Sequence, residues 1–138
     1  MCKWFSSSDY YTGGEPFTHD LTELTSALKS KGLRLHVETA GVYPITGEWD
    51  WICLSPKKFK PVLEEYYGQA NELKSIIYNQ SDFDWAEQQG SKVNSNCRLF
   101  IQPEWSREPE MSISLVNFVK DNPKWTLSMQ IHKYLAIP

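Results

Sequence analysis

Hydrophobic residues recur along the chain at two different spacings, and each spacing predicts one kind of secondary structure. Residues 33–38 alternate between hydrophobic and polar side chains, which is typical of a β-strand with one buried face. Just before them, Leu21, Leu24 and Leu28 recur at the spacing of one helix face, and Gly32 provides a helix stop. This part of the chain is therefore expected to fold as a helix followed by a strand.

The same two patterns continue to the end of the sequence. Further strands are expected at residues 51–54, 73–78, 98–102 and 125–131, and helices at about 61–69, 82–89 and 110–121. Strands that alternate with helices favour parallel pairing through helical crossovers. A closed barrel of eight such units takes roughly 250 residues, whereas this chain has 138. We therefore predict an α/β fold: a partial (β/α) barrel with an open, mostly parallel sheet of about five strands and helices on its outer side.

Composition and charge narrow the class of protein. Hydrophobic residues make up 41% and charged residues 22%, as in one folded domain over residues 1–138, with an atypical segment at 1–11. A net charge of −3 provides no basic surface for nucleic acid. No apolar stretch predicts a membrane span or a signal peptide, so a cytoplasmic location is expected. The three cysteines are widely spaced and indicate neither a disulfide framework nor a metal site.

Polar residues, with a Gly or Pro nearby, follow each place where a strand is expected to end. These segments are Gly13-Gly14-Glu15, Glu38-Thr39, Ser55-Pro56-Lys57, Gln102-Pro103 and Gln130-Ile131-His132-Lys133. In α/β folds, ligands bind at the carboxyl ends of the strands. Five polar endings in succession therefore indicate a ligand site at one edge of the sheet.

Each of these segments also has a purely structural interpretation. The two glycines could form a plain turn, Lys57 could be a solvated lysine, and Gln102 could cap its own loop. The case for His132 depends on strand phase. If residues 125–131 are extended, then Gln130 and His132 share a polar face opposite the hydrophobic one.

The order of the motifs provides a resemblance to known enzymes. Thr12-Gly13-Gly14-Glu15-Pro16 resembles the glycine-rich motif of radical S-adenosylmethionine enzymes. Five further segments match the 7-carboxy-7-deazaguanine synthase family. Together with the glycine motif they resemble that family in order and spacing over residues 12–138; they are Glu38-Thr39, Ser55-Pro56-Lys57, Glu72-Leu73-Lys74, Gln102-Pro103 and Gln130-Ile131-His132-Lys133.

This resemblance implies an activity and a set of ligands. Enzymes of the family convert 6-carboxy-5,6,7,8-tetrahydropterin to 7-carboxy-7-deazaguanine, on the path to queuosine, with S-adenosylmethionine, a [4Fe-4S] cluster and Mg²⁺. The cofactor-binding residues would be Gly13, Gly14, Glu15, Glu38, Thr39, Ser55, Lys57 and Gln102. The substrate-binding residues would be Gln130, His132, Lys133 and the terminal carboxylate of Pro138. No catalytic residue is assigned.

One departure from the family pattern bears on activity. The family carries a C-x-x-x-C-x-x-C run whose thiolates hold the cluster, and this sequence has none. Residues 8–11 are also a poor match for the apolar strand that leads into the glycines, so the first strand–helix unit is expected to be missing. We therefore expect neither cluster nor Mg²⁺ in this chain and no activity from the chain alone.

Three hypotheses stay open. The chain is a fragment of such a synthase, a non-catalytic S-adenosylmethionine- or purine-binding domain, or part of a different radical enzyme that shares the glycine motif. The sequence of the C-terminal segment Gln130–Lys133 argues against the third. A homodimer is a further hypothesis about its assembly.

Overall fold

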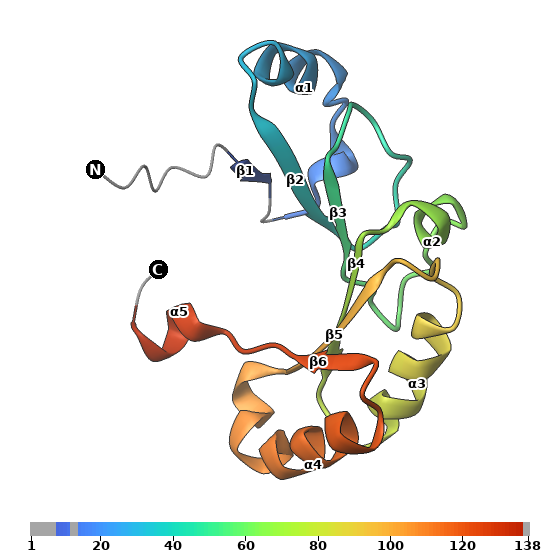
Figure 1. The fold of residues 1–138 in the computed structure, drawn as a ribbon, viewed down its shortest axis with the longest axis vertical. Helices are drawn as coiled ribbons and strands as arrows, with labels where there is room; N and C mark the ends of the chain where they lie inside the picture. Colours follow the sequence, from blue (N-terminus) through green and yellow to red (C-terminus); the bar gives the residue numbers. More distant parts are fainter. Residues whose placement is uncertain (1–7, 12–13, 137–138) are drawn as a thin grey trace.

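The computed structural model describes residues 8–11 and 14–136. At its centre is a six-stranded sheet in which the strands follow one another in chain order and every neighbouring pair is parallel (Figure 1). The strands are β1 (Ser8–Tyr11), β2 (Arg34–Thr39), β3 (Trp51–Leu54), β4 (Glu72–Ile77), β5 (Arg98–Pro103) and β6 (Trp125–Leu127). The prediction of an open parallel sheet in an α/β fold is confirmed.

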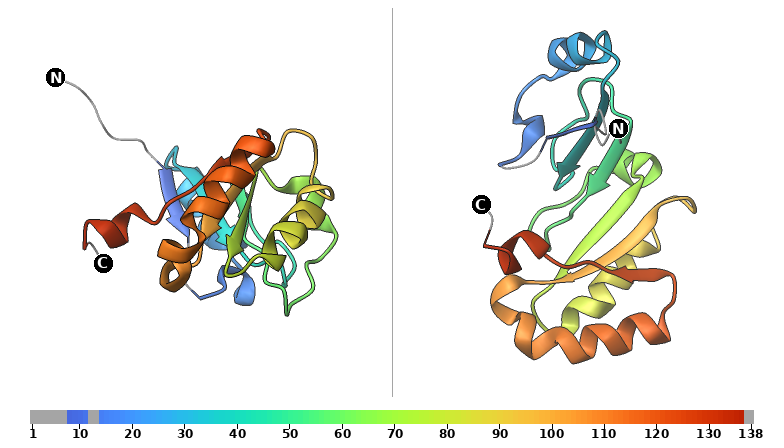
Figure 2. Two further views of the ribbon diagram at one scale, coloured as in Figure 1. Left: turned by 90° about the horizontal axis from the view of Figure 1, so that it is seen from below. Right: turned by 60° about the vertical axis from the view of Figure 1, so that its left-hand side comes forward.

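Helices connect neighbouring strands except β2 and β3, which a loop joins, and one short helix follows β6. They are α1 (Thr22–Lys29), α2 (Glu65–Gln69), α3 (Ser81–Gly90), α4 (Glu108–Asp121) and α5 (Ile131–Tyr134), with short 3₁₀ turns η1 (Pro16–Thr18) and η2 (Trp105–Arg107). Figure 1 shows α2 and α3 on one side of the sheet and α5 on the other, and Figure 2 shows the twist of the strands across the sheet. Among the described residues, no helix has the length and apolar character needed to cross a membrane.

Burial alternates along the strands, as the sequence pattern predicts. In β2, Leu35 and Val37 are buried while Glu38 is partly exposed, and in β4, Leu73 and Ile77 are buried while Lys74 is partly exposed. Burying one such aliphatic side chain contributes roughly 1.5–3 kcal/mol. The hydrophobic core therefore lies on the side of the sheet that the helices cover, and a more polar face is left open.

Helix α1 ends where the sequence predicts, but its buried face differs. Gly32 has φ = +76°, a conformation that favours glycine, and the next amide, that of Leu33, bonds back to the Leu28 carbonyl. Thr25 is the buried residue of this helix, whereas Leu24 is 43% exposed. The Thr25 hydroxyl donates to the Leu21 carbonyl and accepts from the Glu48 amide, so hydrogen bonding decides this face.

The strand expected at residues 125–131 is wrong beyond Leu127. The chain leaves the sheet there, and Ile131–Tyr134 form the short helix α5. The Ser128 amide donates to the Ile101 carbonyl as a last contact with β5. The strand-phase argument for Gln130 and His132 therefore fails, because no strand carries them.

The N-terminal segment is also different from the expectation. Residues 8–11 form β1, which pairs with β2 from Ser8 opposite Arg34 to Tyr11 opposite Val37. Backbone hydrogen bonds to a neighbouring strand can hold a polar segment in a sheet, and composition alone does not reveal them. The sheet thus has one strand more than the five that the pattern located.

Candidate functional site

Two adjoining cavities lie at the carboxyl ends of the strands. The first, of about 90 Å³, is lined by the predicted residues Gly14, Glu15, Glu38, Thr39, Ser55 and Lys57. The second, of about 220 Å³, shares Glu38, Ser55 and Lys57 with the first and adds the predicted residues Gln102, Gln130 and Lys133. We call the two cavities together the strand-end trough.

The structure thus brings together nine of the twelve predicted site residues. Gly13 and Pro138 lie outside the described residues. His132 is exposed on α5 and is not among the residues that line either cavity. Its neighbours Gln130 and Lys133 reach the trough because the chain turns into a helix there, which sequence analysis did not foresee.

Glu15 joins the ends of two chain segments at the trough. Its carboxylate accepts hydrogen bonds from the Thr39 hydroxyl at 2.6 Å and from the Ala40 amide at 2.8 Å. The same Thr39 oxygen accepts from the Gly41 amide at 3.0 Å. Charge-assisted bonds of this kind are stronger than neutral ones, so Glu15 fixes the geometry of the loop after β2.

Opposite charges face each other across the open side of the sheet. Lys74 Nζ on β4 lies 2.6 Å from Glu38 Oε1 on β2, and the Lys74 side chain is the less exposed of the two. Lys57 Nζ, from the loop after β3, lies 3.4 Å from the Ser55 hydroxyl. The trough therefore offers both carboxylate and ammonium groups within one concave surface.

Buried polar side chains form the floor of the trough. Thr39, Ser55 and Gln102 are all nearly inaccessible to solvent. The side-chain oxygen Oε1 of Gln102 accepts a hydrogen bond from the Ser128 hydroxyl at 3.2 Å. Buried hydrogen-bonding groups of this kind are held in fixed directions, which favours selective binding of a polar ligand.

Five residues that line the second cavity are not among the predicted site residues: Lys74, Ile76, Pro103, Glu104 and Trp105. Lys74 is part of a motif that carries the resemblance but is not among the predicted site residues, and Glu104 and Trp105 come directly after Gln102-Pro103. Trp105 is partly exposed, and its ring is contacted by Lys133 and Tyr134. For Glu104 and Trp105 the available signal was position, because they follow the end of β5 that carries Gln102, whereas Lys74 lies within β4.

The described residues do not fit an iron–sulfur cluster or a metal ion. Among residues 8–11 and 14–136, no group of three or more His, Cys, Asp or Glu side chains is arranged to hold a metal. Burial and the nearby Glu72 carboxylate raise the pKa of the Cys53 thiol, and burial raises the pKa of Cys97 to about 11. Cluster ligands are thiolates, so both environments act against that role.

A larger cavity, of about 450 Å³, lies on the outer side of the molecule. It is formed by the loop after β3 and by α3, and its walls include Lys57, Lys58, Phe59 and Trp85. Lys57 is the only predicted site residue in its lining. This cavity therefore adjoins the trough through one side chain.

A parallel sheet in β/α order, with a polar site at the carboxyl ends of its strands, is the arrangement of the (β/α)-barrel class of enzymes. Within this class, the chain is similar to proteins named 7-carboxy-7-deazaguanine synthase. It is 57% identical to the one from Flavobacterium psychrophilum over 127 residues, which is 92% of this chain and 60% of the relative. It is 48% identical to the one from Synechocystis sp. over 126 residues, 91% of this chain and 60% of the relative.

The structure shows the same relationship. The solved structure of QueE from Escherichia coli matches with a TM-score of 0.77 and 25% identity, covering 92% of this chain and 58% of that one. No family model matches the chain. The chain belongs to the 7-carboxy-7-deazaguanine synthase family and spans about 60% of the length of the curated relatives named above.

Proposed function

We propose that the strand-end trough binds S-adenosylmethionine and a pterin substrate as part of a 7-carboxy-7-deazaguanine synthase. The reaction implied by the family is the conversion of 6-carboxy-5,6,7,8-tetrahydropterin to 7-carboxy-7-deazaguanine with loss of ammonia. In the family, bound S-adenosylmethionine supplies the radical chemistry together with a [4Fe-4S] cluster and Mg²⁺. The role of this chain's own side chains is to bind and orient the two ligands.

The observation that carries the proposal is the pairing of opposite charges in the trough. The methionine part of the cofactor has an ammonium group and a carboxylate. Glu38 can accept hydrogen bonds from the ammonium, and Lys57 can donate to the carboxylate. The Lys74–Glu38 ion pair keeps Glu38 oriented toward the open face until the ligand replaces part of that contact.

The second cavity has the groups that a pterin ring requires. The amides of Gln102 and Gln130 can pair with the edge of the ring, and Lys133 can pair with its carboxylate. Trp105 offers an aromatic surface beside them. We include His132 and the Pro138 carboxylate in the proposal as groups on the adjoining tail.

The test is calorimetric titration of the purified chain with S-adenosylmethionine. The wild-type chain should bind, and Glu38→Gln should weaken binding roughly tenfold, the scale of one lost charge-assisted hydrogen bond. Glu23→Gln on the exposed face of α1 removes the same charge and should bind as the wild type does. An absence of binding by the wild-type chain would overturn the proposal.

The second candidate is a binding domain for S-adenosylmethionine or a purine that performs no radical chemistry. The raised thiol pKa values of Cys53 and Cys97 favour it, because neither residue is poised to hold a cluster. The two candidates are distinguished by the coding sequence upstream: a C-x-x-x-C-x-x-C segment there supports the synthase.

A cytoplasmic location and a homodimer remain part of the proposal. Light scattering of the purified chain tests the homodimer.

A further inference from the structure

The loop after β3 carries two successive lysines, which both line the larger outer cavity, but only Lys57 also reaches the strand-end trough. The Lys60 amide donates to the Lys57 carbonyl at 3.1 Å, so Lys58 and Phe59 form the centre of a turn. Lys57 lines both cavities of the strand-end trough. Lys58 lines neither of them and instead lies against α3.

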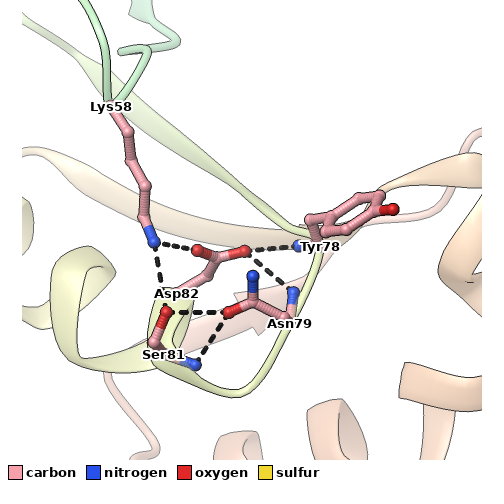
Figure 3. A network of polar contacts seen from close by, with 5 residues as sticks. All are labelled: Lys58, Tyr78, Asn79, Ser81 and Asp82. Carbon is pink, nitrogen blue, oxygen red and sulfur yellow. Dashed lines mark hydrogen bonds and ion pairs between the residues drawn. The ribbon is translucent and has the colours of Figure 1, made fainter.

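Asp82 in the first turn of α3 holds Lys58. Its carboxylate is deeply buried, 5% exposed as a side chain, and forms an ion pair with the Lys58 ammonium (Figure 3). Its other oxygen accepts from the backbone amides of Tyr78 at 2.6 Å and Asn79 at 2.9 Å. These two backbone bonds fix the carboxylate to the end of β4 independently of Lys58.

Two weaker contacts add to this attachment. Lys58 Nζ lies 3.4 Å from the Ser81 hydroxyl, which in turn donates to the Asn79 side chain at 2.8 Å (Figure 3). The ammonium also lies 6.0 Å from the centre of the Trp85 ring. The Lys58 ammonium is thus held by three side chains of α3, those of Ser81, Asp82 and Trp85.

The tip of the turn has few other attachments. Phe59, next to Lys58, is 81% exposed, and Lys60 is exposed as well. A chain segment without contacts has many conformations, and a ligand that needs one of them must bear the entropy of ordering it. The Lys58 contacts reduce that cost before any ligand arrives.

We propose that Lys58 and Asp82 are positioning residues: their ion pair anchors the turn at residues 57–60 to α3 and so directs Lys57 into the strand-end trough. This inference rests on the proposed function, because Lys57 is taken as the cofactor contact. The anchor does not touch the ligand itself and acts only through the backbone that connects it to Lys57.

The charge state of Asp82 suits this role at neutral pH. Burial by itself would raise the pKa of the carboxyl group, but Lys58 and the backbone amides of Asn79 and Tyr78 outweigh it and lower the pKa. The carboxylate therefore stays ionised, and the ion pair stays intact, under the conditions of a binding experiment.

The test is a double-mutant cycle on the whole chain, with S-adenosylmethionine as the probe in calorimetry. Lys58→Met keeps the hydrophobic stem and removes the charge, and should weaken binding roughly fivefold to tenfold. Lys57→Met should weaken binding as well, and the double variant should bind no worse than Lys57→Met alone. Lys58→Arg should restore most of the affinity.

The matched control is Lys124→Met, because Lys124 also forms an ion pair with α3, through Glu87 at 2.6 Å. This variant should bind as the wild type does. Additive effects of Lys57→Met and Lys58→Met, or an equal loss in Lys124→Met, would overturn the proposal.

A second measurement separates this proposal from the proposed function. In hydrogen exchange without ligand, Lys58→Met should speed exchange of the Lys60 amide, while Lys124→Met should not. If the wild-type chain binds no cofactor, the proposed function fails, and this exchange result still tests the anchor. Unchanged exchange at Lys60 shows that the turn does not depend on Lys58, and the anchor is then rejected.

Discussion

The two described cysteines show how neighbouring residues set the reactivity of a side chain. Cys53 lies in β3 and is buried, and its thiol donates to the Glu72 carboxylate at 3.4 Å. Cys97 is half-buried just before β5. Burial in both cases disfavours the thiolate, and the nearby Glu72 carboxylate adds to the effect, so the pKa of each thiol is raised.

We expect slow alkylation of both thiols at pH 8. With a pKa of about 11, roughly one Cys97 in a thousand is thiolate at pH 8, against about a quarter of an ordinary thiol. Because the thiolate is the nucleophile, the Cys97 rate should rise about tenfold from pH 8 to pH 9, while Cys53 should stay unmodified. Iodoacetamide labelling followed by peptide mass spectrometry measures both rates.

Glutathione is the reference thiol for that experiment, and the urea-unfolded chain is the control. If native Cys97 reacts at pH 8 as fast as glutathione, its surroundings do not suppress ionisation, and the argument against a cluster-ligand role for it fails.

At the scale of elements, the loop after β2 approaches the core closely at Gly41. Gly41 has φ = +74°, and an added Cβ would lie 2.7 Å from Leu54 Cδ1 and 3.1 Å from Val62 Cγ1. Leu54 is completely buried and cannot move aside freely. Gly41 therefore sets how closely the Glu38–Thr39 strand end approaches the helix-covered side.

We expect Gly41→Ala to destabilise the chain more than Gly32→Ala. Both residues have positive φ, which costs alanine about 1–2 kcal/mol, but Gly32 has no atom within 4 Å of an added Cβ. Overpacking at Gly41 should add roughly 1–3 kcal/mol to the loss in free energy of unfolding. Urea denaturation of the two variants measures the difference, and equal losses would show that the Gly41 contact relaxes.

At the scale of the whole molecule, neither described cysteine lines the proposed cofactor site, although Cys53 is the strand neighbour of Glu38. Neither Cys53 nor Cys97 is among the residues that line the strand-end trough. A [4Fe-4S] cluster that binds S-adenosylmethionine needs three thiolates around one position. The proposed binding of the cofactor can therefore be tested separately from its reductive cleavage.

We expect the purified chain to bind S-adenosylmethionine without cleaving it. The measurement is anaerobic iron–sulfur reconstitution, addition of a reductant, and chromatographic assay for 5′-deoxyadenosine. The full-length relative from Flavobacterium psychrophilum, treated identically, is the positive control. Cluster-dependent 5′-deoxyadenosine from this chain would show that its cysteines can assemble a cluster after all.

The sequence predicted the parts of the fold that depend on local pattern. Residues 33–38 alternate because one side of β2 faces the helices, and the local sequence also located β5 and α4. It failed at β1 and after Leu127, where pairing between strands and departure from the sheet decide the conformation. These are contacts between distant residues, which a local pattern does not contain.

For the candidate site, the sequence by itself determined the chemical groups and their order along the chain. Polar residues after successive parallel strands must gather at one edge, because parallel strands all end there. Only the tertiary structure decided which of them meet: it brought Gln130 and Lys133 in through a helix, left His132 exposed, and added Lys74 and Trp105. It also decided that Lys58 pairs with Asp82, since that pair joins the loop after β3 to α3, and their distance depends on how the whole sheet packs against that helix.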